Sequence, residues 1–128
     1  MPRPPRDRGA AAVEFALVAL LLVTLLMGIL EFGRLFSIQA SLAQASRDAA
    51  RTMAVRDDAG EASAQFYATF SPLGGDPDAA TVSISREGTP GTPGCREVVE
   101  GSYVATSLTG FFGGSFTLGA QGAMRCNG

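Results

Sequence analysis

The feature that most constrains this 128-residue chain is an uninterrupted apolar run near its amino terminus. Residues 15–30 contain no ionisable side chain. At ~1.5 Å per helical residue this run spans roughly 24 Å, a little less than the ~30 Å hydrocarbon core of a bilayer. Adding residues 10–13 lengthens the segment to about 31 Å, but it also brings Glu14 into the membrane. We therefore expect a transmembrane helix over residues 10–30 in which Glu14 has a specific role.

The segments that flank the apolar run predict its topology. Residues 1–9 contain three Arg, one Asp and three Pro, which indicates a short, non-helical, cytoplasmic leader. A removable secretory signal would place a small-residue cleavage site just after the run, whereas Glu31-Phe32-Gly33-Arg34 follows it. The Ala-Gln-Ala sequence at residues 43–45 lies too far downstream. We expect the helix to stay in the membrane, with the rest of the chain outside.

Apolar side chains recur at three- and four-residue steps beyond residue 30, so we expect the helix to continue over residues 31–57. The predicted stripe consists of Phe32, Leu35, Phe36, Leu42, Ala45, Ala49 and Met53. The polar residues that fall outside it are Arg34, Gln44, Arg47, Asp48 and Arg51. Glu31 with Arg34, and Asp48 with Arg51, are spaced for weak surface ion pairs. The apolar stripe is the expected contact surface for a partner.

The rest of the chain predicts a small α+β domain. Residues 58–79 indicate a short helix, at about 61–70, and a loop. Residues 80–128 indicate three antiparallel strands: around Val82 and Ile84, over residues 97–108, and around the even-numbered positions from 116 to 126. The fold class is therefore a long amino-terminal transmembrane and amphipathic helix followed by a small three-stranded antiparallel β-meander.

Cys95 and Cys126 lie on either side of the expected hairpin that joins the last two strands. An extracytoplasmic location would permit a disulfide between them, and closing this loop would stabilise a thin core by roughly 3–4 kcal/mol. The alternative is two separate buried thiols. At least one of the two hairpin residues Phe111 and Phe112 is expected to tuck under the sheet, and the alternative is an exposed partner-binding tip.

Composition argues against several classes of function. The net charge is −2, and all ten basic residues are Arg, so we expect no nucleic-acid partner. With no His and no Lys, the chain offers neither the common general base nor Ser-Lys chemistry. We expect no catalytic residues, no metal site and no cofactor, and hence no enzymatic activity.

The junction at Arg8, Gly9 and Ala10, with Glu14 and Phe15 following, resembles the processing site of type IV pilin-like precursors. Residues 8–17 and 28–36, the latter containing Glu31, Phe32, Gly33 and Arg34, look more specifically like the TadE family of the tight-adherence (Flp) pilus system. The likeness covers roughly the first 55 residues, judged against the expected helix limits. Phe15 stands where the main Flp pilins carry Tyr, which favours a minor pseudopilin.

The resemblance implies cleavage by a prepilin peptidase between Gly9 and Ala10, so that Glu14 becomes the fifth mature residue. Its carboxylate would pair with the new amine of a staggered neighbour, and Phe15 would belong to the same assembly region. The implied partners are the lipid bilayer, the prepilin peptidase, related pseudopilin and pilin subunits, and the inner-membrane assembly platform. The implied location is the cytoplasmic membrane or a surface pilus.

Two alternatives stay open at this stage. The first is an uncleaved bitopic anchor that presents an extracytoplasmic binding module, with Glu14 marking the cytoplasmic interface. The second concerns Gly28 and Gly33, which either permit a bend or pack closely against another membrane helix.

Overall fold

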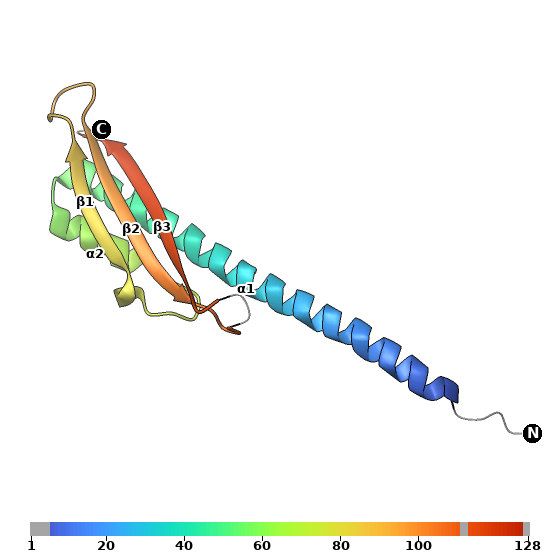
Figure 1. Ribbon diagram of the computed structural model, residues 1–128. Helices are drawn as coiled ribbons and strands as arrows, with labels where there is room; N and C mark the ends of the chain where they lie inside the picture. Colours follow the sequence, from blue (N-terminus) through green and yellow to red (C-terminus); the bar gives the residue numbers. More distant parts are fainter. Residues whose placement is uncertain (1–5, 111–112, 127–128) are drawn as a thin grey trace, which may run out of the picture.

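A computed structural model describes residues 6–110 and 113–126. Helix α1 (Arg6–Arg56) is followed by α2 (Ala59–Thr69), a 3₁₀ turn η1 (Pro77–Ala79) and strands β1 (Thr81–Glu87), β2 (Arg96–Thr106) and β3 (Ser115–Arg125). The sheet and α2 cover the carboxyl-terminal half of α1, while its amino-terminal half projects from the domain as a bare rod (Figure 1). The predicted α+β class, with one long apolar helix and a three-stranded antiparallel sheet, is confirmed.

The first helix starts earlier than the sequence indicated. We expected a non-helical leader to residue 9, but α1 begins at Arg6, directly after Pro5. The prediction is wrong for residues 6–9 because proline restricts the residues around it and does not prevent a helix from starting just behind it. The part of the leader before Arg6 lies outside the described residues.

The break between the two helices lies next to residue 57, the predicted end of the first helix. Asp57 adopts a positive φ of 53°, which ends α1. The Asp58 side chain then caps α2 by accepting hydrogen bonds from the backbone N–H groups of Gly60 and Glu61. Because the cap is Asp58, α2 starts at Ala59, two residues before the predicted start.

The strands form one antiparallel sheet in the order β1-β2-β3. Phe116, Leu118 and Ala120 of β3 pack against the core, as the alternation predicted, whereas Met124 is 40% exposed. Leu118 lies opposite Tyr103. The ambiguous facing of β2 is settled by its burial, since Val99, Tyr103 and Ala105 point to the core. Strand β2 ends at Thr106, two residues earlier than predicted. Phe111 and Phe112, whose packing was also predicted, lie outside the described residues.

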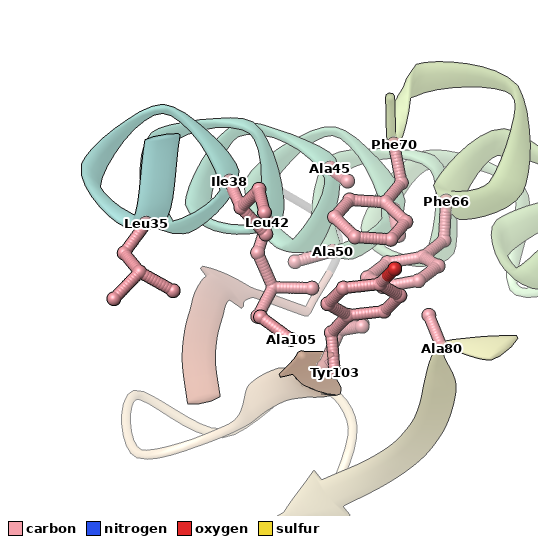
Figure 2. Packing of buried hydrophobic residues seen from close by; sticks show 12 residues of the cluster. Leu35, Ile38, Leu42, Ala45, Ala50, Phe66, Phe70, Ala80, Tyr103 and Ala105 are labelled. Carbon is pink, nitrogen blue, oxygen red and sulfur yellow. The ribbon is translucent and has the colours of Figure 1, made fainter. Parts of the chain in front are cut away.

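The core fills the space between α1, α2 and the inner face of the sheet (Figure 2). Ile38 and Leu42 of α1 are fully buried there. They face an aromatic group in which the Phe70 ring lies 5.8 Å from Phe66 and 5.2 Å from Tyr103. These edge and stacked contacts add to the apolar area that the small domain buries.

Part of the predicted apolar stripe points away from this core. Leu35, Leu42, Ala45 and Ala49 are buried as expected, but Phe32 and Phe36 are 59% and 77% exposed. Phe36 follows Leu35 by one residue, which turns its side chain about 100° around the helix. The stripe therefore packs mostly on the chain's own sheet, and the prediction that it forms the partner contact is wrong for its buried part.

The predicted Asp48–Arg51 pair is absent from the ion pairs of the described residues, and Asp48 accepts hydrogen bonds from Gln44 instead.

Gly122 allows β3 to touch the backbone of α1. A Cβ atom at this position would lie 2.2 Å from the Ser46 carbonyl oxygen, whereas one at Gly119 would meet nothing nearer than 4.0 Å. We expect Gly122→Ala to destabilise the domain by about 2–3 kcal/mol, because a helix backbone cannot yield as a side chain can. Gly119→Ala is the matched control, and urea unfolding in detergent measures both. Equal stability of the two variants would contradict this packing.

Candidate functional site along the amino-terminal helix

The amino-terminal half of α1 is covered by no other part of the described chain. Its most apolar 18-residue window has a mean hydropathy of 2.6 and no buried residue. Phe15 and Leu21 are more than 70% exposed. By length and composition this is the one helix among the described residues that could cross a membrane. A soluble chain would not leave so large an apolar surface in water.

The residues of the predicted processing site follow one another in the first turns of α1. Gly9, Ala10, Glu14 and Phe15 are all exposed. A Cβ atom at Gly9 would meet nothing within 4 Å, so packing within the chain does not require glycine there. The bond between residues 9 and 10 lies inside the helix, and Gly9 weakens that turn by up to about 1 kcal/mol relative to Ala.

Glu31 and Arg34 occupy a place that the sequence did not predict. Both were expected to form a surface pair, but their exposed fractions are only 1% and 7%. The Glu31 carboxylate accepts hydrogen bonds of 3.0 and 3.2 Å from the backbone N–H of Leu108. Arg34 donates from Nε to the Leu73 carbonyl oxygen at 2.9 Å and from Nη1 to that of Thr106 at 2.8 Å. The surface-pair prediction is therefore wrong, because both charges bind loop backbone.

These hydrogen bonds fix two loops to the helix just after the apolar run ends. One loop follows α2 and the other follows β2, and each gains a charge-assisted hydrogen bond. The buried charges thereby receive the partners that burial demands. Gly33 and Phe32, which lie between them in the sequence, stay on the exposed side. Helix α1 runs unbroken through Gly28 and Gly33.

Helix geometry places Glu14 and the exposed aromatic residues on one face. Phe32 follows Glu14 by 18 positions, which is five full turns of an α-helix. Phe36 lies one turn further and about 40° around the axis. Glu14, Phe32 and Phe36 thus line a face that the sheet does not cover.

The disulfide between Cys95 and Cys126 is present, which confirms that prediction. The two Cα atoms lie 5.4 Å apart, and the Cys126 N–H donates to the Cys95 carbonyl oxygen. Glu97 places a carboxylate oxygen within 4.8 Å of both sulfur atoms. Sulfur atoms joined in a disulfide supply no thiolate, so this group does not form a metal site while the bridge is intact.

The sequence did not predict a polar cluster that lies at the carboxyl-terminal end of α1. Arg86 binds both the buried Glu97 and Asp57, which ties β1 to the end of α1. The hydrogen bond to Glu97, followed by that to Asp57, raises the pKa of Arg86 above its ordinary value. Asp57, Arg86 and Glu97 are too far apart in the sequence to form a local pattern. In the structure, the cluster lies where Asp57 adopts a positive φ.

Comparison with known protein families gives one match, which falls on α1. The family model described as TadE-like protein matches residues 9–51. Residues 9–51 are TadE-like. No curated protein and no solved structure matches the chain.

The TadE-like segment begins at Gly9, includes the apolar rod and the Glu31–Arg34 junction, and ends under the sheet. This confirms the family resemblance seen in the helical region. Together, the match and the apolar helix support a single-pass membrane protein and indicate one related to the Tad pilus. The matched region does not include α2 and the sheet.

Removing the Glu31 carboxylate should free the loop after β2. In Glu31→Ala the Leu108 N–H loses its acceptor, and we expect its hydrogen exchange to accelerate at least about tenfold, since one such bond contributes about 1.5–3 kcal/mol. Amide exchange in detergent micelles measures this. The control is Glu100→Ala, which removes an exposed carboxylate from the outer face of β2. Unchanged exchange at Leu108 in Glu31→Ala would contradict the assignment.

Proposed function

We propose that this chain is a minor pseudopilin that assists the assembly of Tad/Flp pili and is processed by a prepilin peptidase between Gly9 and Ala10. The observation that carries the proposal is the position of the TadE-like match. It falls on the bare apolar rod and its junction with the domain. A helix that its own chain leaves uncovered needs lipid or other helices, as in a pilus assembly.

The role is structural and not enzymatic. The chain has no His and no Lys from which a general base could be built. Its partners in this proposal are the prepilin peptidase, the pilin and related pseudopilin subunits, and the inner-membrane platform. The leader lies in the cytoplasm, because its arginines favour that side, and the domain with its disulfide lies outside.

Glu14 acts in this proposal as the assembly residue. After cleavage, the Ala10 amine of one subunit pairs with Glu14 of a staggered neighbour at the membrane boundary. At ~4 Å and an effective dielectric constant of about 20, the attraction is about 4 kcal/mol before desolvation is subtracted. The exposed position of Glu14 on the helix leaves the carboxylate accessible to such a neighbour.

The helix face that carries Glu14 also carries the partner contact outside the membrane. Phe32 and Phe36 expose large aromatic surfaces on it, whereas Leu35, Leu42, Ala45 and Ala49 of the predicted stripe are buried in the core. A neighbouring helix that pairs with Glu14 would meet these two rings after about five turns. The proposed contact surface is therefore the face that carries Glu14, Phe32 and Phe36, and not the whole predicted stripe from Phe32 to Met53.

One observation favours the uncleaved bitopic anchor as a second candidate. The bond between Gly9 and Ala10 lies within α1, and a helical bond must unwind before a peptidase can cut it. Gly9 reduces the free energy of that unwinding, which is consistent with either candidate. The mature amino terminus separates the two.

Processing is tested with the pair Gly9→Leu and Ala12→Leu. In cells that contain the peptidase we expect Gly9→Leu to accumulate at precursor mass, because a large side chain blocks close approach to the bond. Ala12→Leu introduces the same residue three positions away, and the mature form of this variant should begin at Ala10. Intact-mass measurement and amino-terminal sequencing of the membrane-extracted protein report both. A wild-type chain that still begins at Met1 would favour the uncleaved anchor.

Assembly is tested separately with Glu14→Gln, which keeps the size of the side chain and removes its charge. We expect normal cleavage but at least about tenfold less pilin co-purified from cross-linked membranes, since each 1.4 kcal/mol is worth a factor of ten. Glu100→Gln, on the outer sheet face, is the control and should behave as wild type. Wild-type recovery of pilin with Glu14→Gln would remove Glu14 from the assembly contact.

A further inference from the structure

Two loops at the end of the domain nearest the bare half of α1 each expose one large apolar side chain. We name them the base loops: residues 71–75, after α2, and residues 107–110, after β2. Leu73 is 60% exposed and Leu108 is 66% exposed. The folded domain leaves both outside its core, although other apolar residues of the domain are packed within it.

The base loops lie at the level where α1 leaves its apolar segment. Leu108 is held through its N–H by Glu31, and Leu73 through its carbonyl oxygen by Arg34. Glu31 and Arg34 come one and four residues after Leu30, which at 1.5 Å per residue is about 2–6 Å along the helix axis. The interfacial layer on each side of the hydrocarbon core is roughly 5–8 Å thick. The base loops are thus at the depth of the lipid headgroups, and Figure 1 shows this end of the sheet facing the bare rod.

Several backbone groups of the base loops are hydrogen-bonded within the protein. Arg34 also binds the Thr106 carbonyl oxygen. The Gly75 N–H donates to the Pro72 carbonyl oxygen, and the Gly110 N–H donates to the Ser107 hydroxyl. Backbone that is already hydrogen-bonded loses little when it enters a region poor in water. The opposite charges of Glu31 and Arg34 add no net charge to this surface.

We propose that the base loops rest in the bilayer interface, with Leu73 and Leu108 inserted among the headgroups and upper acyl chains. The occupant of this surface is lipid because both leucines flank α1 at the level of exposed Leu30, where the surrounding membrane is already in contact with the helix. The two contacts would fix the tilt of the domain against the membrane. This inference rests on the membrane anchoring by residues 10–30 in the proposed function.

The absence of Trp from the chain makes a direct test possible. Leu73→Trp and Leu108→Trp are each prepared in the full chain and reconstituted into vesicles of phosphatidylcholine and phosphatidylglycerol. Some of the lipids are brominated near the top of the acyl chains. Leu21→Trp in the apolar rod is the positive control. Val55→Trp, an equally exposed position at the far end of α1, controls for the affinity of Trp itself for membranes.

We expect both loop variants to emit at shorter wavelength than Val55→Trp and to be quenched several-fold more strongly by the brominated lipid. Quenching no stronger than that of Val55→Trp, with Leu21→Trp strongly quenched, would overturn the inference and leave the anchor intact. An unquenched Leu21→Trp would overturn the anchor as well. A wavelength shift that grows with the ratio of protein to lipid, without quenching, would assign the surface to a second copy of this chain and also overturn the inference.

Discussion

The burial of Glu31 and Arg34 against loop backbone is the interaction on which the rest of the structure depends. It stands where one helix changes its environment, from a rod exposed on all sides to a helix with one face in a core. Two charged side chains at such a boundary would ordinarily remain in water, since removing them from it is costly. Here each charge is hydrogen-bonded to the backbone of a loop beside the helix. The junction therefore decides where the domain sits along α1.

Patterns that lie within one element were readable from the sequence. The apolar run, the alternation in β3 and the position of the helix break each follow from neighbouring residues, and the Cys95–Cys126 pairing follows from the hairpin between them. Glu31 and Arg34 were misread because their partners lie 77, 39 and 72 residues away. At i and i+3 on a helix they suggested a surface pair, and tertiary contacts overrode that local preference.

For the candidate site too, some features could be predicted from the sequence and others depended on tertiary packing. The resemblance drew attention to Gly9, Glu14 and the motif at residues 31–34, and the family match covers all of them. Which helix face is available to a partner depended on where the sheet packs, and residue periodicity alone grouped the exposed Phe32 and Phe36 with residues that are buried in the core. Cleavage and assembly involve other molecules, so the fold of one chain contributes only access: an exposed helix start and a Gly9 that no internal packing requires.

A single rod serves as both the apolar segment and the core helix, and this has a mechanical consequence. Ile38 and Leu42 are fully buried in the domain, while the same helix continues unbroken through Gly33 and Gly28 into the bare half. Protein cores are close-packed and do not deform continuously, so a pull on the rod acts on the whole sheet. Because α1 is one continuous helix, the orientation of the domain follows that of the rod. In the proposed arrangement, contacts along the rod and contacts at the base loops must therefore agree on one tilt, which would restrict how neighbouring subunits are arranged around it.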